Sequence, residues 1–248
     1  MDFDKISSKT FWGKFLRFPL TFIPPETVMP ILRGKLKGKR WIVGSGTHGC
    51  WLGTYEYDKQ HIFEASVKPG SIIFDIGAHA GFYTLLASVL VGANGKVFAF
   101  EPLPRNLFYL KEHLRLNNIT NVTVIEAAVS NFSGVTSFEE SSTGYQGGIT
   151  SQGKLQVNAV NLDELIARGE IPIPDYIKID VEGHEKSVLV GAKSMLANAH
   201  PTIFLAIHGR PVLQQCRQLL ESLGYKLKAL DGNNLAQLPK NTEIIAYR

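Results

Sequence analysis

The densest group of ionisable residues in this sequence is the run Asp-Val-Glu-Gly-His-Glu, which begins at Asp180. An apolar segment at 176–179 precedes the run and is typical of a buried strand. Asp180 and Glu182 could accept a proton, hold a divalent cation or attract a cationic ligand. Glu185 is expected to begin a helix, where a carboxylate interacts favourably with the helix dipole. His184 is a candidate contact for a substrate.

A histidine follows the next apolar segment, 202–207, which also has the pattern of a buried strand. The carboxyl ends of parallel strands meet at one edge of a sheet, so we expect His208 to lie beside Asp180. Imidazole titrates near neutral pH, which makes His208 the preferred general base, ahead of Asp180 and Glu182. The alternative is a divalent cation on all three side chains. Magnesium prefers oxygen ligands, so the histidine argues against magnesium, though not against manganese or zinc. Between the two mechanisms, we predict general-base catalysis without a metal.

A second group of residues has the spacing of a nucleotide-binding turn. An apolar strand at 71–74 is followed by Asp75-Ile76-Gly77-Ala78-His79-Ala80-Gly81 and then by an apolar helix at 82–91. Gly77 and Gly81 would let the backbone approach a ligand closely. Glu101 ends the next strand, 96–100, where a carboxylate suits the two hydroxyls of a ribose.

The glycine spacing favours one class of cofactor. A dinucleotide turn reads G-x-G-x-x-G and presents N–H groups to a pyrophosphate, whereas this turn reads D-x-G-x-x-x-G. Asp75 would repel phosphate but could interact, directly or through water, with the amino group of a cationic amino-acid ligand. The pattern therefore favours S-adenosylmethionine over a nicotinamide dinucleotide. The alternatives are a nicotinamide-dependent oxidoreductase and a non-catalytic interaction module that keeps the fold.

Further cofactor contacts are expected from the same edge of the sheet. A strand at 122–125 ends at Glu126 and Ala127, where a backbone N–H or the Glu126 carboxylate could contact adenine. The alternative for Glu126 is exposure to solvent. The full set of candidate cofactor contacts is Glu56, Asp75, Gly77, Ala78, His79, Gly81, Glu101, Pro102, Glu126, Ala127 and Asp180.

Residues 131–160 interrupt the alternation of strands and helices and are expected to form a hairpin-like insertion. Segments with β propensity at 135–138 and 155–160 flank a polar, glycine-rich stretch that contains Tyr145. A long polar loop beside an active edge is more often a lid or a substrate selector than a spacer. We therefore expect an acceptor hydroxyl, on a small polar molecule or glycan, to lie under this loop in contact with Tyr145.

Residues 1–68 are expected to form an extension that packs at the active edge of a domain comprising residues 69–248. The extension would contain a short amphipathic helix, a strand at 36–43, a glycine-rich loop at 44–49 and a helix at 57–67. Trp51 and Tyr55 are candidate acceptor contacts, and for Trp51 the alternative is core packing. The extension could also join two copies of the chain in a homo-oligomer.

Composition limits the class of protein and its partners. The net charge is +4, and the sequence has neither an apolar run of membrane-spanning length nor a secretion signal, so a cytoplasmic location is expected. Cys50 and Cys216 lack metal-ligand spacing and are expected to be reduced thiols. The basic residues cluster at 33–40 without a nucleic-acid-binding motif, so nucleic acid is not the expected partner.

The remaining segments complete an α/β pattern. Helices are expected at 104–116 and 212–223, with a further short helix from position 161. The last two strands, at 225–230 and 243–247, are joined by a short loop and should pair antiparallel.

Several of these motifs together resemble the FkbM family of S-adenosylmethionine-dependent methyltransferases, from about Trp51 to Tyr247. The residues that carry the resemblance are 75–81, Phe100-Glu101-Pro102 with Asn106, Leu162-Asp163-Glu164, 177–185 and Gly191-Ala192. The resemblance implies a class I, Rossmann-like methyltransferase sheet of seven strands in the order 3-2-1-4-5-7-6, with the seventh antiparallel. It also implies methyl transfer to a hydroxyl oxygen of a sugar or natural product.

Two positions depart from the family pattern. His79 stands where the family usually has asparagine, which puts a cofactor contact from that side chain in question. Ala206-Ile207-His208 stands where a glutamate is common, so a role for that acid is absent or has moved to His208.

Overall fold

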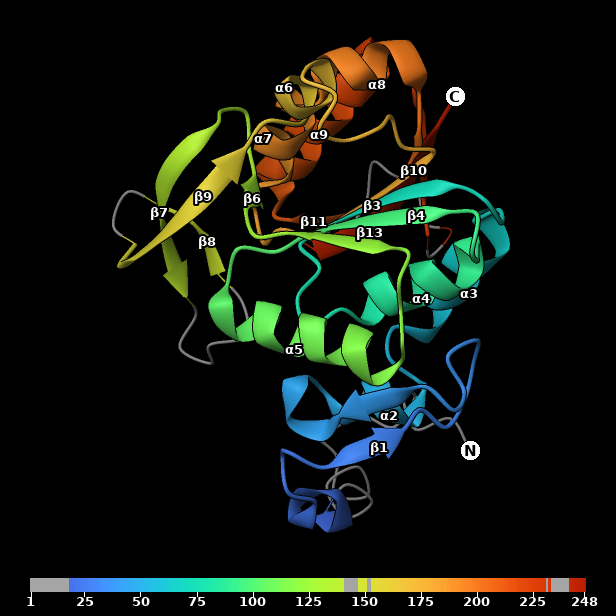
Figure 1. The fold of residues 1–248 in the computed structure, drawn as a ribbon. Coiled ribbons are helices and arrows are strands. Elements are labelled where there is room, and N and C mark those ends of the chain that lie inside the picture. The colour runs from blue at the N-terminus through green and yellow to red at the C-terminus, as the bar shows by residue number, and fades with distance from the viewer. Residues whose placement is uncertain (1–17, 141–146, 151–152, 231, 233–240) are drawn as a thin grey trace.

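Seven apolar segments form one sheet at the centre of the computed structural model, which describes residues 18–140, 147–150, 153–230, 232 and 241–248 (Figure 1). The strands are β3 (Ile72–Ile76), β4 (Lys96–Phe100), β5 (Val122–Ile125), β10 (Tyr176–Ile179), β11 (Thr202–His208), β12 (Lys226–Ala229) and β13 (Asn241–Tyr247). Their spatial order is β5-β4-β3-β10-β11-β13-β12. β13 is antiparallel to both β11 and β12. This order and orientation confirm the predicted seven-stranded arrangement.

Helices cover both faces of the sheet, which explains why its inner strands are apolar on both sides. One face is covered by α3 (Tyr57–Ser66), α4 (Phe82–Val91) and α5 (Pro104–Leu116). The opposite face is covered by α6 (Leu162–Ala167), α7 (Glu185–Val190), α8 (Lys193–Ala199) and α9 (Arg210–Ser222). None of the described helices is both long enough and apolar enough to cross a lipid bilayer.

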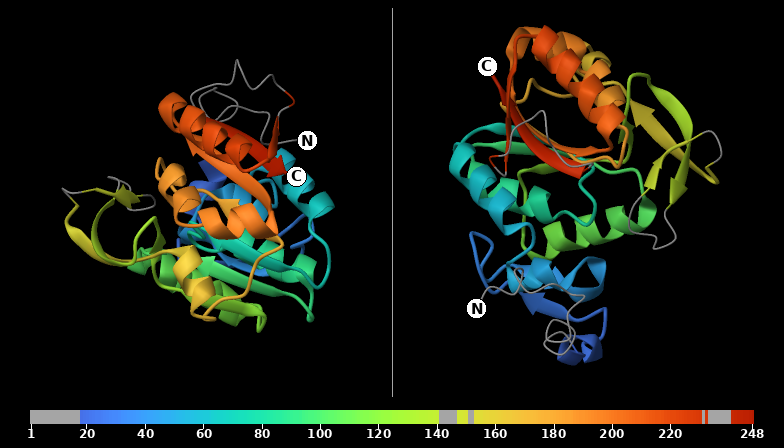
Figure 2. Two further views of the ribbon diagram at one scale, coloured as in Figure 1. Left: turned by 90° about the horizontal axis from the view of Figure 1, so that it is seen from above. Right: turned by 180° about the vertical axis from the view of Figure 1, so that it is seen from behind.

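The predicted insertion forms a second, smaller sheet beside the central one (Figures 1 and 2). Its strands, in the spatial order β6-β9-β7-β8, are β6 (Ala128–Val129), β7 (Gly134–Glu140), β8 (Gly147–Ile149) and β9 (Leu155–Val160). β7 and β9 pair antiparallel, as expected for a hairpin. The sequence did not indicate β6 and β8, because two or three residues are too few to show an alternating pattern. The Tyr145 prediction lies outside the described residues.

The extension contains a small hairpin and several short helical turns. Its described elements are η2 (Phe18–Phe22), β1 (Val28–Pro30), β2 (Arg40–Ile42), η3 (Val43–Ser45) and α2 (His48–Leu52), followed by α3. The predicted strand at 36–43 is wrong except for β2, because Gly34 and Gly38 adopt positive φ and turn the chain between β1 and β2. The predicted loop at 44–49 is also shorter than expected, since α2 begins at His48.

His113 on α5 joins this extension to the domain. The ring is fully buried; its Nδ1 lies 2.7 Å from the carbonyl oxygen of Ala80, and its Nε2 accepts a hydrogen bond from Ile42 N at 3.0 Å. Nδ1 therefore carries the proton of the neutral ring. Trp41 stacks on the ring, with centroids 3.7 Å apart. Burial lowers the pKa of His113 to about 4, because the buried cation would be poorly solvated.

Acidification is expected to destabilise the protein through His113. The folded pKa of about 4 lies below the unfolded value of about 6.5, so the unfolded chain binds the extra proton first. The free energy of unfolding should fall by about 2 kcal/mol between about pH 7 and about pH 5 from this group alone. Urea unfolding of the wild type and of His113→Gln measures the effect. The stability difference between the two proteins should shrink on acidification, and a pH-independent difference would contradict the assignment.

Candidate active site

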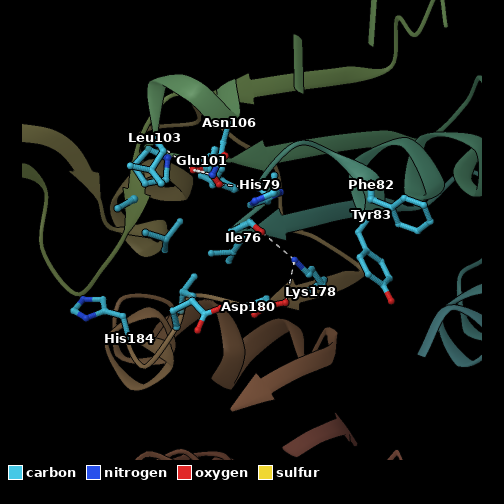
Figure 3. A pocket seen from close by; sticks show the side chains of 18 of the residues that line it. Ile76, His79, Phe82, Tyr83, Glu101, Leu103, Asn106, Lys178, Asp180 and His184 are labelled. Carbon is cyan, nitrogen blue, oxygen red and sulfur yellow. Dashed lines mark hydrogen bonds and ion pairs between the residues drawn. The ribbon is translucent and has the colours of Figure 1, made fainter. Parts of the chain in front are cut away.

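A cavity of about 550 Å³ opens where β3, β4 and β10 end (Figure 3). The turn after β3 and the segment after β4 form one side, and residues after β10 form the other. The extension contributes Trp41, Gly46, Thr47, Cys50 and Tyr55, and the insertion contributes Phe138, Gly148 and Ile149. Both the extension and the insertion therefore line the cavity at the carboxyl edge of the sheet.

Glycine is required in the turn after β3 by packing as well as by backbone conformation. Gly77 has φ +76°, and a Cβ there would collide with the backbone oxygen of Asp180 at the end of β10. Gly81 has φ +90°, and a Cβ there would overlap the Leu110 side chain on α5. The two glycines therefore bring the turn against β10 and α5, and Gly77 also lines the cavity.

Glu101 is buried and braces the turn from the end of β4. Its Oε2 accepts a hydrogen bond from His79 N at 2.8 Å, while Oε1 accepts from Leu103 N at 3.0 Å and from Asn106 Nδ2 at 3.2 Å. Burial raises the pKa of Glu101 despite these hydrogen bonds, which favour the charged form. A carboxylate has about four acceptor sites, so little capacity remains for a ligand. The predicted grip on two ribose hydroxyls is thus limited to about one further hydrogen bond.

Asp75 lies beneath the cavity and does not line it. Its Oδ2 accepts a hydrogen bond from Thr84 Oγ1 at 2.6 Å, and its Oδ1 lies 3.3 Å from Lys178 Nζ. Lys178 also donates to the carbonyl oxygen of Gly77 at 3.0 Å. The carboxylate is therefore neutralised within the protein, and the structure gives no support for the predicted interaction of Asp75 with a cofactor amino group.

One buried polar atom of a cavity-lining residue, Nε1 of Trp41, lacks a hydrogen-bond partner among the described residues. The hydroxyl of Tyr83, which is also buried, is directed instead to Glu56, outside the cavity lining. A buried polar group without a partner is costly, so Trp41 Nε1 is suited to contact a bound molecule. Together with the close backbone approach at Gly77, it fits a ligand that is large and carries polar groups.

Asp180 and Glu182 line the far side of the cavity and differ in their electrostatic surroundings. Burial alone would raise the pKa of Asp180, but the charges of Lys178 and Lys59 hold it below its usual range. The pKa of Glu182 is raised, mainly by burial and further by the charge of Asp180. Asp180 is therefore the weaker base of the two.

His208 lies immediately behind these carboxylates. Its Nε2 is 3.6 Å from Glu182 Oε2 and 3.9 Å from Asp180 Oδ1, although the ring itself does not line the cavity. Its Nδ1 is 2.7 Å from Glu185 Oε1, and this hydrogen bond is the largest cause of the raised pKa of His208. The structure brings together the three predicted residues, and their potential ligand atoms lie within 4.8 Å of one another, close enough to hold a cation.

The other predicted site residues divide between the cavity and its surroundings. Ala78, His79, Pro102 and Ala127 line the cavity, as do Tyr55 and His184. His184 Nε2 lies 3.2 Å from Ser130 Oγ. Gly81 stands outside the lining, at the start of α4.

Three predicted contacts lie away from the cavity. Trp51 is buried in the core, the alternative considered from the sequence, and its Nε1 donates to His48 Nδ1 at 3.1 Å. Glu56 pairs with Lys59 at 3.1 Å. Glu126 is exposed and pairs with Lys111 at 2.6 Å, so its carboxylate does not face the cavity.

Sequence reasoning missed that Lys178 lines the cavity. A lysine within Tyr-Ile-Lys-Ile, a strand buried on both faces, was the available signal, because a buried ammonium needs charged partners. The partners are Asp75 and Asp180, at 3.3 and 3.9 Å. Glu185 was also missed as a partner of His208, since its position alone indicated a helix start.

Comparison with known proteins finds a match to the family described as "Methyltransferase FkbM domain" over residues 75–227. The chain is 30% identical to "Hexuronic acid methyltransferase AglP" of Haloferax volcanii over 155 residues, 62% of each protein. It is 27% identical to "31-O-demethyl-FK506 methyltransferase FkbM" of Streptomyces tacrolimicus, with 51% of this chain and 61% of that protein covered. The chain thus spans about three fifths of each relative.

Solved methyltransferase structures share the fold. A methyltransferase FkbM from Methylobacillus flagellatus superposes with a TM-score of 0.52 at 17% identity, covering 82% of this chain and 56% of that one. A precorrin-6y C5,15-methyltransferase from Geobacter metallireducens gives 0.52 at 18% identity, covering 78% and 89%. The central sheet is therefore a class I methyltransferase sheet.

Proposed function

Because the chain belongs to the FkbM methyltransferase family, we propose that it transfers a methyl group from S-adenosylmethionine to a hydroxyl oxygen of a sugar, glycan or natural product. The observation that carries the proposal is that two groups of residues face each other across one cavity. The turn after β3 and Glu101 lie on one side, and Asp180 and Glu182, with His208 behind them, lie on the other. One side is suited to a nucleoside and the other to a hydroxyl that must lose its proton.

The residues of β3, β4 and β5 would hold the cofactor. Gly77 and the backbone of His79 lie where an amino-acid moiety can approach, and Glu101 can accept a hydrogen bond from a ribose hydroxyl. Pro102 and Ala127 offer apolar contacts for adenine at the same edge. When bound, S-adenosylmethionine supplies an electrophilic methyl group on a sulfonium centre. Asp180 and Glu182 place negative charge on the opposite side of the cavity, which suits a cation.

The acceptor would enter between the insertion and the acidic cluster. Phe138 and Ile149 present apolar surface there, and His184 adds a polar group. Two relatives support an oxygen acceptor on such a molecule, since their names specify a hexuronic acid and a 31-O-demethyl natural product. His208 Nε2 lies 3.6 Å from Glu182 Oε2, so a hydroxyl group held against Glu182 lies within reach of His208.

We assign His208 as the base that accepts the proton of the acceptor hydroxyl. The raised pKa of His208 makes it a stronger base than an ordinary histidine, whereas the lowered pKa of Asp180 makes that carboxylate a poor acceptor. A divalent cation on Asp180, Glu182 and His208 is the second arrangement that the geometry favours, because it would lower the pKa of the hydroxyl directly. The nicotinamide alternative has no support in the family match or in the named relatives.

Transfer of a labelled methyl group tests the proposal. Extract from a strain that lacks this protein should contain the unmethylated acceptor. The purified chain with methyl-labelled S-adenosylmethionine should therefore label a compound in that extract, and the same compound should be lighter by one methyl group in the deletion strain. Extract from the parent strain is the matched control and should accept less label. Cofactor binding without transfer to any compound would instead indicate a non-catalytic module.

A further inference from the structure

We propose that Glu185 is a positioning residue that orients the His208 ring and fixes its neutral tautomer, an inference that rests on the proposed function of His208 as the proton acceptor. Glu185 begins α7 and its side chain is fully buried. A carboxylate whose only role was to interact with the helix dipole could remain in solvent. Complete burial instead requires compensating partners, because an unpaired buried charge is costly.

The partners of Glu185 fix the position of its carboxylate. Oε1 accepts a hydrogen bond from Gly183 N at 2.9 Å and lies 2.7 Å from His208 Nδ1. Oε2 is buried without a hydrogen-bond partner among the described residues. The contacts therefore converge on the oxygen that faces the histidine, as expected if holding the ring is the main function of this buried acid.

The direction of the proton follows from the chemistry of the pair. Oε1 already acts as an acceptor, from Gly183 N, and a carboxylate oxygen only accepts hydrogen bonds, so we assign the proton of the pair to Nδ1. In the neutral ring, Nε2 then carries the lone pair. Nε2 faces the carboxylates of Glu182 and Asp180, which line the cavity, at 3.6 and 3.9 Å. Glu185 thus directs the basic nitrogen of His208 toward the place assigned to the acceptor.

Both residues of the pair stand on packed elements. Glu185 stands one turn from Val188 and Leu189, which are buried in the main hydrophobic cluster, and His208 is the last residue of β11 in the seven-stranded sheet. Side chains on packed helices and strands hold a catalytic geometry better than side chains on loops. Glu185 does not line the cavity and acts only through His208.

Nitrogen NMR of protein with ring-labelled histidine tests the assignment. Spectra recorded above the pH at which the ring titrates should show His208 with the proton on Nδ1, and His208→Gln identifies its signals among the seven histidines. In Glu185→Ala the ring loses its acceptor, and the proton should move partly or wholly to Nε2. Val188→Ala is the matched control, because it loosens the same helix without removing the carboxylate and should leave the tautomer unchanged.

Two outcomes would overturn the inference: a proton on Nε2 in the wild type, or the same tautomer in the wild type and in Glu185→Ala. The wild-type spectrum alone still decides the first outcome if Glu185→Ala does not fold. The spectra require no methyl acceptor, so they test the role of Glu185 independently of methyl transfer. A failure of the proposed function would appear instead as an absence of methyl transfer in the labelling experiment. Where an acceptor is available, Glu185→Ala should lower kcat by about tenfold to a hundredfold with cofactor affinity retained.

Discussion

The His208→Ala variant is expected to lower kcat at least about a hundredfold, while its affinity for S-adenosylmethionine stays close to that of the wild type. The substitution removes the nitrogen that we propose accepts the hydroxyl proton, and the lowered pKa of Asp180 leaves that neighbouring carboxylate a weak substitute. The ring does not line the cavity, so cofactor contacts remain in place. Steady-state kinetics with the acceptor found by label transfer, together with calorimetry for the cofactor, measure the two quantities.

The control for this prediction is His61→Ala, because His61 is exposed on α3 and lies outside the cavity lining. Its kcat should equal that of the wild type. Wild-type activity should also survive EDTA. Loss of activity in EDTA with rescue by manganese would contradict general-base catalysis. It would indicate a cation held on Asp180, Glu182 and His208.

The Gly77→Ala variant is expected to lose cofactor binding, with affinity reduced at least about a hundredfold, and to be destabilised by about 3 kcal/mol or more. A methyl group at this position would meet the backbone oxygen of Asp180, so either the turn or the end of β10 would have to move. Both segments line the cavity. Calorimetry and urea unfolding measure the two losses.

Gly70→Ala is the matched control, because Gly70 has a similar φ of +82° but nothing within 4 Å of the position of a Cβ. It should cost only the backbone penalty, about 1 to 2 kcal/mol, with cofactor affinity unchanged. Equal effects of the two substitutions would show that backbone conformation alone, and not the contact with Asp180, makes Gly77 necessary.

The sequence predicted the central sheet well because each strand is a short apolar run bounded by turn residues. Segments 96–100, 122–125 and 176–179 agree with β4, β5 and β10 at both ends. The same pattern placed Asp180 and His208 at one edge, and the structure brings them within 3.9 Å. Residues that directly follow buried strands are therefore the part of the site that sequence periodicity can predict.

Side-chain partners could not be predicted in the same way. Glu126 follows β5 at the correct edge, yet its side chain turns outward to Lys111, and no sequence pattern specifies that direction. The contact between Glu185 and His208 depends on how α7 packs against β11. Asp75 was expected to follow its strand but lies within β3, where the charge of Lys178 from the neighbouring strand neutralises it. These relations arise from three-dimensional packing between segments that are distant in the sequence.

Calorimetric titration with S-adenosylmethionine tests the central claim most directly. The wild type should bind one molecule per chain and should give no heat of binding with NADH. Glu101→Ala should weaken binding by about 1.5 to 3 kcal/mol, because the proposed charge-assisted hydrogen bond to the ribose is lost and the bracing of the turn at His79 is removed. Glu126→Ala, which removes a carboxylate at the same edge but outside the cavity, should bind like the wild type. Binding of NADH in place of S-adenosylmethionine, or unchanged affinity in Glu101→Ala, would contradict the account.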